Sequence, residues 1–370
     1  MRGVGKGFRH WPWLWWKKPD IMYTPVATLP YAHGEPHGRG LLKASPDDFV
    51  VEEILGFEPS GAGEHVFLWV EKRDENTEHV ARSLARLAGV PQRETGYAGL
   101  KDRHGVTRQW FSVKFPLKAE PDFSALESAT VKILGMTRNA RKLRKGALTG
   151  NRFIIRIRQF SGDRSALTQR LALLAARGVP NYFGSQRFGH DGGNISRVLA
   201  FFAGQLSSID TGQRGLYLSA ARSELFNRVL AARVAAGTWD QPLEGDVFMF
   251  ADSHSFFRSP VDDTIRRRMA ELNIHPSGPL WGNGENPVSA TVAALEAAVL
   301  AEAPELTGGL ERHGLEMARR PLRLCPDGLS LEFAEPDQLE IRFSLPAGAY
   351  ATTLLRELLV FNDTEVNPCR

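Results

Sequence analysis

Cysteine is scarce in this sequence: its 370 residues include only Cys325 and Cys369. Two cysteines can form neither a disulfide framework nor a structural zinc site. This scarcity is typical of a protein that works in a reducing compartment, so we expect a cytoplasmic location. Long apolar runs are absent as well, since no stretch reaches the roughly 18 residues that a membrane span requires. We therefore expect no membrane partner.

The sequence also lacks the short motifs of several large enzyme classes. It has no GxxxxGKS or GxxxxGKT phosphate loop, no GxGxxG after a strand, no GxSxG elbow, and no HExxH or CxxC pair. These absences argue against ATP, nicotinamide, zinc and serine-hydrolase chemistry. We expect no metal site and no small-molecule cofactor.

Length and patterning indicate two structural units. A mass of 41.0 kDa exceeds what one compact core usually holds. Alternating or doubly apolar runs predict strands, at 49–51, 66–70, 109–115, 152–160 and 339–344. Helical spacing predicts helices, at 77–87 with Thr77 as the cap, 220–234, 290–303 and 352–359. The simplest architecture is an α+β fold: an antiparallel-sheet domain, over 22–177 and 323–370, interrupted by a mostly helical insertion over 178–322.

Positive charge is concentrated in one stretch, although the net charge is only +4. Between Arg138 and Arg158 the sequence has eight basic residues and no acidic one: Arg138, Arg141, Lys142, Arg144, Lys145, Arg152, Arg156 and Arg158. Such a run can follow the phosphates of a nucleic acid, or it can be an ordinary solvated face. The candidate phosphate contacts are Arg141, Lys142, Arg144 and Lys145.

A glycine-framed loop over 96–109 carries one carboxylate, Asp102, among three potential cations. Lys101 and Arg103 are its neighbours in sequence, and Arg108 could fold back toward it. A carboxylate near cations stays ionised at neutral pH and could serve as a nucleophile or a base. The alternative is an Asx-type turn with solvated basic neighbours. Lys101 is a candidate substrate contact.

Two further segments combine aromatic and polar residues. In the first, over 150–153, Phe153 could stack on an exposed base and Asn151 could bond to its edge, although a strand-start aromatic usually belongs to the core. In the second, over 179–189, aromatics alternate with small and polar residues, as in an RNA-facing hinge or an ordinary tight loop.

Together these segments resemble one family, tRNA pseudouridine synthase D (TruD). The resemblance rests on several motifs in order: LLKASPDDFVVEE over 41–53, GLKDRH over 99–104, GNRF over 150–153, PNYFGSQRFG over 180–189, LSAARS over 218–223 and LPAGAYAT over 345–352. It covers nearly the whole chain, from about Leu29 to about Glu357. Residues 1–21 depart from the family pattern; we expect an extension before a start at Met22, the alternative being an aromatic and basic arm that touches RNA.

The resemblance implies a fold, a reaction and roles for particular residues. Family members isomerise uridine at position 13 of the tRNA D arm to pseudouridine, without metal or organic cofactor. They have an antiparallel-sheet catalytic domain and a family-specific insertion that together form a cleft. The family's catalytic aspartate falls on Asp102, its stacking aromatic on Phe153 and its active-site asparagine on Asn151. The early lysine falls on Lys43, as a charge partner or phosphate contact. We expect a monomer with tRNA as its partner.

Two alternatives of other classes remain open. One is a non-catalytic RNA-binding or ribosome-associated protein on the same scaffold. The other is a nuclease or phosphodiesterase that uses Asp102 and His104, which would need a metal cluster or a paired histidine. The sequence does not choose between attack of Asp102 at C1′ and removal of the 2′ proton to give a glycal, because both routes need the same carboxylate.

Overall fold

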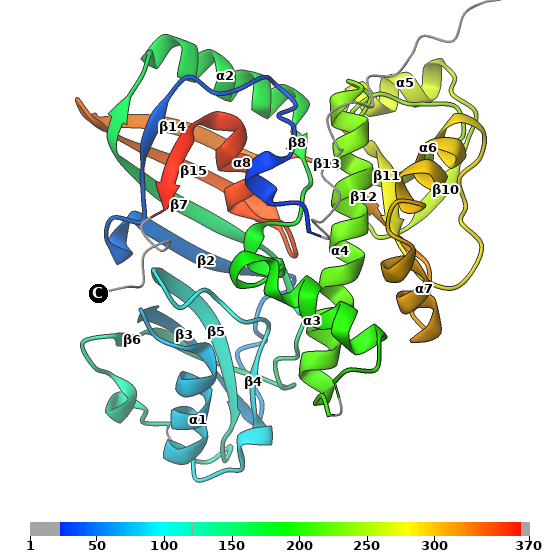
Figure 1. Cartoon of the computed structure of the whole chain (residues 1–370). Helices are drawn as coiled ribbons and strands as arrows, with labels where there is room; N and C mark the ends of the chain where they lie inside the picture. Colours follow the sequence, from blue (N-terminus) through cyan, green and yellow to red (C-terminus); the bar gives the residue numbers. More distant parts are fainter. Residues whose placement is uncertain (1–22, 120, 207, 364–370) are drawn as a thin grey trace, which may run out of the picture.

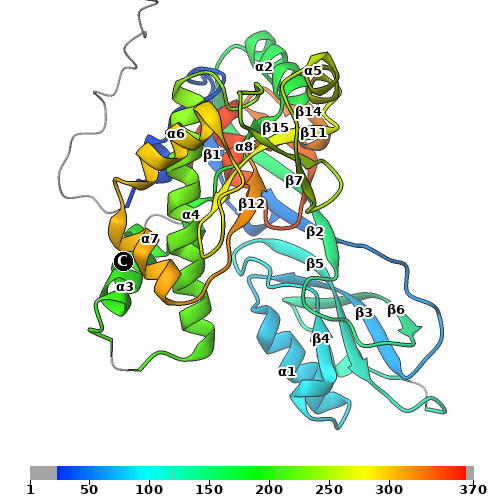
Figure 2. The same ribbon diagram turned by 90° about the vertical axis from the view of Figure 1, so that its right-hand side faces the viewer.

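The computed structural model describes residues 23–119, 121–206 and 208–363. The expected extension over 1–21 and Cys369 lie outside the described residues. Figure 1 shows two sheets with the long helix α4 (Thr211–Ala235) running between them. In Figures 1 and 2, helix α1 (Thr77–Leu87) and its strands form a lobe at the lower end of the molecule.

The larger sheet has ten strands and is built from both ends of the chain. Its main path follows the order β14-β15-β7-β2-β5-β3-β6, with β1, β4 and β16 paired beside it. The strands are β1 (Arg39–Leu42), β2 (Phe49–Leu55), β3 (His65–Arg73), β4 (Thr95–Tyr97), β5 (Val106–Lys114), β6 (Val131–Asn139), β7 (Leu148–Ser161), β14 (Asp327–Glu335), β15 (Gln338–Pro346) and β16 (Val360–Asp363). All five strands expected from the sequence are therefore confirmed.

The pairing within this sheet is antiparallel except at two places. Strands β1 and β16 pair in parallel, and so do β2 and β5. The expected antiparallel sheet is thus confirmed in the main and corrected at these two pairs. Helices α2 (Arg164–Arg177) and α8 (Ala351–Leu358) pack on β7 and β15 in one core, and α1 packs on β3 and β5 in another.

The cap of helix α1 lies one residue before the position that the sequence indicated. Its cap is Asn76, whose side chain accepts a hydrogen bond from the Glu78 N–H. The expected cap, Thr77, is buried instead and uses its hydroxyl elsewhere. Asn and Thr are both good caps, so composition alone did not separate them.

The middle of the chain forms a smaller sheet covered by helices. Its strands pair in the order β10-β9-β11-β12: β9 (Val247–Phe250), β10 (Phe256–Arg258), β11 (Ile274–Leu280) and β12 (Ala318–Pro321). The helices are α3 (Gly193–Phe202), α4, α5 (Asp263–Ala270), α6 (Ala290–Leu300) and α7 (Pro304–Arg312). The expected helix over 220–234 is confirmed as part of α4, and the one expected over 290–303 is confirmed as α6, which ends three residues earlier, at Leu300. The sequence patterns did not indicate these four strands individually, and β11 contains two prolines.

Both connections between the two parts of the chain pass one short ladder. Strand β8 (Val179–Pro180) pairs with β13 (Arg323–Leu324) in antiparallel register. The chain passes β8 after it leaves the larger sheet at the end of β7, and it passes β13 before it rejoins that sheet at β14. A short 3-10 helix, Ser185–Arg187, begins five residues after the end of β8.

Candidate active site

Buried polar side chains of α1 and β5 hold the loop between β4 and β5 in place. Thr77 Oγ1 accepts from the Lys101 N–H (3.2 Å) and donates to Gln109 Oε1 (2.9 Å). Gln109 Nε2 in turn donates to the carbonyl of Gly99 (3.2 Å). Thr77 and Gln109 are 1% and 0% exposed, so these bonds are shielded from water. The loop that carries Asp102 is therefore held in one conformation.

A glycine closes this loop because no other residue fits there. Gly105 has a φ of +133°, and a Cβ on it would lie 2.7 Å from the carbonyl oxygen of Phe49. Its N–H donates to Asp74 Oδ1 (3.2 Å), and its carbonyl accepts from the Asp74 N–H (3.1 Å). A side chain at this position would push the loop away from β2.

Two of the three cations expected around Asp102, Lys101 and Arg108, have other partners, and Arg103 is exposed. Lys101 Nζ lies 2.8 Å from Glu53 Oε2, in an ion pair whose side chains are 5% and 0% exposed. Arg108 donates to Glu71 (2.8 Å) and to Glu52 (2.5 Å), so the expectation that it folds back toward Asp102 is wrong. Both residues lie in the sheet or beside it, where cross-strand carboxylates are closer than the loop.

A different lysine supports the loop directly. Lys72 on β3 is fully buried, and its Nζ donates to the carbonyls of Glu75 (2.8 Å) and Asp102 (3.1 Å). Burial lowers the pKa of Lys72 to about 8, an effect that the nearby charges of Asp102 and Glu75 oppose. Lys72 thus ties the backbone of Asp102 to the larger sheet.

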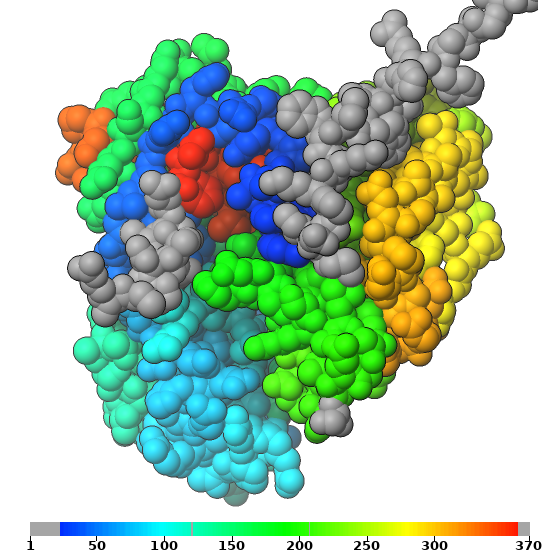
Figure 3. Space-filling model, viewed as in Figure 1, coloured from blue at the N-terminus to red at the C-terminus, as the bar shows by residue number. Residues whose placement is uncertain are grey.

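The carboxylate of Asp102 meets a residue from the other part of the chain. Gln186 Nε2, in the short helix after β8, donates to Asp102 Oδ1 (3.2 Å). Asp102 is half-buried, so one of its oxygens is engaged here while the group keeps access to solvent. Figure 3 shows the surface hollowed between the cyan lobe, which contains this loop, and the green segment that contains Gln186. Asp102 lies where the two parts of the molecule meet.

Asn151 and Phe153 lie on the same face of β7, two residues apart. Asn151 pairs with Glu53 on β2 and with Leu345 on β15. Its Oδ1 is buried and has no hydrogen-bond partner among the described residues. Phe153 is 7% exposed, stacks on Phe343 with centroids 5.2 Å apart, and belongs to the core. The expected substrate pair is therefore brought together, with an unsatisfied acceptor above a mostly buried ring.

Lys43 directly follows β1 and reaches the aromatic group that includes Phe153. Its Nζ is 4.6 Å from the centroid of the Phe49 ring, which meets Phe153 edge to face at 6.3 Å. The backbone of Lys43 has a φ of +55°, an uncommon value for a residue with a side chain. Such a conformation is often retained at functional positions.

The basic run divides into a paired half and an exposed half. The strand residues Arg152, Arg156 and Arg158 each lie within 4 Å of a carboxylate, of Glu52, Glu340 and Asp48 respectively. This half of the run therefore fits the interpretation as an ordinary protein face, because neighbouring carboxylates neutralise its charge.

The loop half of the run lies beside the Asp102 loop. The Gly146 N–H donates to the carbonyl of Ala98 (2.7 Å), which joins the two loops. Arg141, Arg144 and Lys145 are exposed and form no ion pair within the residues that the structure describes. Lys142 is half-buried and donates to the carbonyl of Arg93. The sequence-predicted RNA contacts are thus adjacent to the candidate site.

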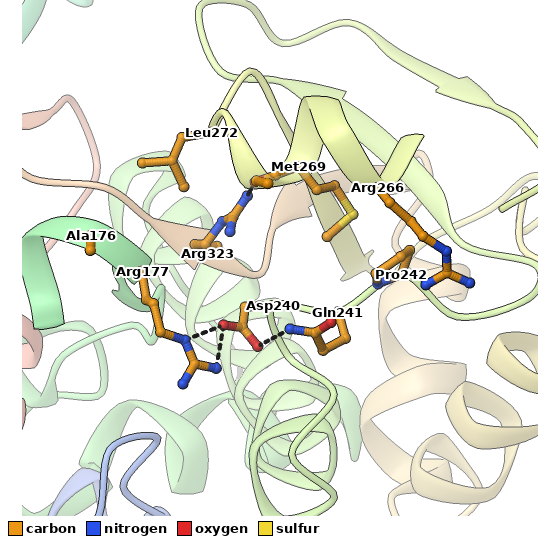
Figure 4. Close-up of a pocket in the computed structure, with 10 residues that line it drawn as sticks. Ala176, Arg177, Asp240, Gln241, Pro242, Arg266, Met269, Leu272 and Arg323 are labelled. Carbon is orange, nitrogen blue, oxygen red and sulfur yellow. Dashed lines mark hydrogen bonds and ion pairs between the residues drawn. The ribbon is translucent and has the colours of Figure 1, made fainter. Parts of the chain in front are cut away.

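A pocket of about 280 Å³ lies elsewhere, lined by residues of α2, α5, β13 and the segment after α4. Figure 4 shows Arg177 of this pocket bonded to Asp240, through Nε at 3.0 Å and Nη2 at 2.6 Å. None of the residues singled out from the sequence for chemistry lines this pocket. It is separate from the candidate active site.

Sequence reasoning missed the residues that hold the site together. Glu53 and Gln186 stand inside quoted motifs, so attention to the polar residues within those motifs could have found them. The sequence patterns indicate Thr77 only as a helix cap, and Gln109 only as the end of the loop over 96–109 and the start of a strand. Lys72 gave no signal, because a buried lysine in a strand looks like any other surface residue in the sequence.

The geometry agrees with comparisons to known proteins. A family model described as tRNA pseudouridine synthase D (TruD) matches residues 26–199 and 200–358. The chain belongs to this family, as the motifs indicated. A tRNA pseudouridine synthase D of Methylococcus capsulatus is 54% identical over 335 residues, which cover 90% of this chain and 95% of the relative. One of Pseudomonas fluorescens is 49% identical and covers 89% of this chain and 94% of its own.

A solved structure supports the fold. A crystal structure described as tRNA pseudouridine synthase D from Methanosarcina mazei superimposes with a TM-score of 0.65 at 22% identity, covering 89% of this chain and 95% of its own. The expected α+β architecture is confirmed.

Two kinds of feature are absent from the described residues. None of the described helices is long and apolar enough to cross a membrane. In the same part of the chain, no group of three or more His, Cys, Asp or Glu side chains is arranged to hold a metal ion.

Proposed function

We propose that this protein isomerises uridine to pseudouridine in tRNA, at position 13 of the D arm, with Asp102 as the acting carboxylate. Membership of the family, and relatives named tRNA pseudouridine synthase D that span nearly the whole chain, support the reaction and the tRNA substrate. They do not support the non-catalytic alternative. We also propose the position of the uridine in the tRNA and the roles of the individual residues.

The reaction exchanges one bond and adds no external atom. The C1′–N1 bond breaks, the C1′–C5 bond forms, N1 gains a proton and C5 loses one. The base must leave its stack before an enzyme can reach these atoms, so base flipping is part of the proposal. A single fixed carboxylate is sufficient to assist, either by attack at C1′ or by removal of the 2′ proton.

The observation that carries the proposal is the setting of Asp102. Its loop is fastened by buried Thr77, Gln109 and Lys72, and its carboxylate is half-buried beside Gln186 from the other part of the chain. A base or nucleophile that is fixed in advance loses little entropy when it reacts. The same loop as a plain solvated turn would need no such buried support.

The neighbouring face of the larger sheet offers a place for the uracil. The unsatisfied Oδ1 of Asn151 can accept a hydrogen bond from the N3–H of the base. Phe153 forms the apolar floor beside it, and Lys43 supplies positive charge at the aromatic group that includes Phe153. Because the Lys101 ammonium is engaged by Glu53, we assign Lys101 a positioning role at the edge of this site.

The proposal includes the domain division and the setting of the protein. The catalytic domain spans 22–177 and 323–370, and the insertion spans 178–322, since both crossings coincide with the β8/β13 ladder. We propose a monomer in the cytoplasm with tRNA as its partner, and the exposed loop residues Arg141, Arg144 and Lys145, with Lys142, as contacts to tRNA phosphates.

Carbodiimide mapping of pseudouridine in tRNA tests this function. Unmodified transcripts of several tRNAs with uridine at position 13 are incubated with the purified protein, beside matched transcripts with cytidine there. We expect one new stop at position 13 in the first set and none in the second. A stop at another uridine would keep the reaction and overturn the target, whereas no stop in any transcript would overturn the function.

A further inference from the structure

Three arginines from separate elements converge next to the candidate site. Arg187 follows Gln186, Arg222 lies on α4, and Arg320 lies on β12; we call them the arginine cluster. Arg187 Nη1 donates to Ser219 Oγ (3.1 Å), one turn before Arg222 on α4. The guanidinium carbons of Arg187 and Arg320 lie 5.7 and 4.2 Å from the centroid of the same Phe183 ring.

Arg222 is connected to Arg320 through strand β11. Arg222 Nη2 donates to the carbonyl of Leu280 (2.6 Å), at the end of β11. Arg320 pairs with Gly278, two residues before Leu280 on the same strand. Arg320 also lies 5.7 Å from the ring of Phe226, one turn after Arg222. The three side chains therefore share one neighbourhood between α4, β12 and the short helix after β8.

No carboxylate neutralises the arginine cluster within residues 23–119, 121–206 and 208–363. Arg187 bonds to the hydroxyls of Ser219 and Tyr350, and Arg222 bonds to backbone carbonyls. Arg320 bonds to Asn181 Oδ1 (2.6 Å) and the carbonyl of Gly348 (3.1 Å). The adjacent Arg319, in contrast, is fully buried against Glu296 at 2.7 Å. A partly buried guanidinium without a counter-charge is costly, so its retention calls for an anion.

The cluster also keeps unsatisfied donors. The Nε atoms of Arg222 and Arg320 are buried and have no hydrogen-bond partner among the described residues. Burial lowers the pKa of Arg320 to about 10, and the charge of Arg187 acts in the same direction. A phosphate diester has two unbridged oxygens that accept charge-assisted bonds from planar guanidinium groups, which fits such a set of donors.

The position of the cluster relative to Asp102 indicates which anion it would bind. Gln186, the residue before Arg187, bonds to the Asp102 carboxylate. Tyr350, which accepts from Arg187 Nε at 2.9 Å, follows β15, whose Leu345 pairs with Asn151. The cluster is thus connected to both parts of the candidate site. An RNA strand that delivers a base to this site carries its phosphates past the same region.

We propose that Arg187, Arg222 and Arg320 bind one backbone phosphate of the tRNA next to the flipped uridine. This inference rests on the proposed function, because it uses Asp102 to locate the reacting base. The arginines read no sequence; they fix where the strand lies relative to the carboxylate.

Neutral linkages in the RNA test this contact. A tRNA is assembled with a single methylphosphonate at each linkage from two nucleotides before to two after the target uridine. Its affinity is measured for full-length Asp102→Asn protein, as the parent, and for the same protein with Arg187→Gln, Arg222→Gln or Arg320→Gln. We expect one linkage at which the neutral group weakens parent binding about tenfold or more. The same linkage should then weaken binding to the arginine variants by less than about twofold, because the partner charge is already gone.

Controls separate this contact from a structural role. Arg267→Gln, on the exposed face of α5, should leave the effect of every linkage unchanged. Arg222→Lys should recover part of the lost affinity, because it keeps the charge. Should Arg320→Gln fail to fold, Arg187→Gln and Arg222→Gln carry the test, since both side chains are half-exposed.

Two outcomes would overturn the proposal. In one, every linkage weakens the parent and the variants by the same factor, so that the arginines act only on the fold. In the other, inorganic phosphate alone protects the parent from thermal unfolding and no linkage matters, so that the cluster holds a free anion. Both outcomes are measured as binding by an inactive protein. They can therefore be told apart from a failure of the mapping experiment, which uses the unmutated enzyme.

Discussion

Cations line both sides of the candidate site, but their partners differ. On the side of the larger sheet, Lys101 and Arg108 have carboxylate partners and Lys72 has carbonyl partners. On the side of α4 and β12, the arginine cluster bonds to hydroxyl, carbonyl and amide oxygens and has no carboxylate partner among the described residues. On the sheet side the charges of Lys101 and Arg108 are neutralised and the Asp102 loop is fixed, which suits this side to hold one reacting carboxylate. The opposite side keeps uncompensated charge, which suits it to hold a substrate phosphate.

Removing a carboxylate from the sheet side should have the largest effect. Glu53→Ala leaves the buried ammonium of Lys101 without its partner, which should lower the free energy of unfolding by about 3–5 kcal/mol. Asp47→Ala breaks the exposed pair with Arg73 and should cost less than about 1 kcal/mol. Urea unfolding of both variants measures the difference. Equal losses would contradict the distinction between buried and exposed pairs.

Lys72 should make stability depend on pH in a defined window. Its pKa is about 8 in the folded protein and about 10.5 in the unfolded chain, so between these values the unfolded state binds more protons. The free energy of unfolding should therefore rise with pH there, relative to Lys72→Met, by about 2 kcal/mol from pH 7.5 to 9.5. Urea titrations of both proteins at the two pH values give this difference. A constant difference would mean that Lys72 is not desolvated.

Neutralising the basic loop should weaken tRNA binding and also reduce the salt dependence of that binding. Changing Arg141, Lys142, Arg144 and Lys145 to Gln should reduce affinity about tenfold near physiological salt and flatten the plot of log Kd against log salt. The same four-charge loss at Arg152, Arg156, Arg158 and Arg342 serves as a comparison, because those side chains have carboxylate partners. An unchanged slope in the loop variant would assign the loop to a solvated face.

The smallest effect is expected at the contact between the two sides. Gln186→Ala removes one hydrogen bond to Asp102 at a partly exposed site, and should lower kcat about fivefold or less. KM for tRNA should stay within about twofold, since Gln186 is assigned no phosphate. Single-turnover and steady-state rates separate the two. A large rise in KM with unchanged kcat would assign Gln186 to substrate binding instead.

Five of the ten strands of the larger sheet could be predicted, because their residues alternate apolar and polar or, in β3, form one apolar run. Residues 339–344 alternate apolar and polar side chains, and the structure places Leu339, Ile341 and Phe343 in the core. Strand β11 could not be recognised in the same way. Its residues are buried on both faces and include Pro276 and Pro279, which usually argue against a strand.

The chemistry-bearing residues of the site could be proposed from motifs, but their environment could not. Asp102 stands out within a glycine-framed loop, whereas its supports Lys72 and Gln186 lie 30 residues before and 84 after it. The partners of the basic run could not be predicted from the sequence either. Its strand half has carboxylate partners that lie across the sheet, and sequence spacing does not contain that information.

The central claim is that Asp102 performs the chemistry while other residues bind the tRNA. Single-turnover pseudouridine formation and tRNA affinity of Asp102→Asn, measured side by side with the unmutated protein, test it most directly. The account predicts a rate lower by about a thousandfold or more with affinity within about twofold. A variant that still makes pseudouridine at nearly the original rate would contradict it.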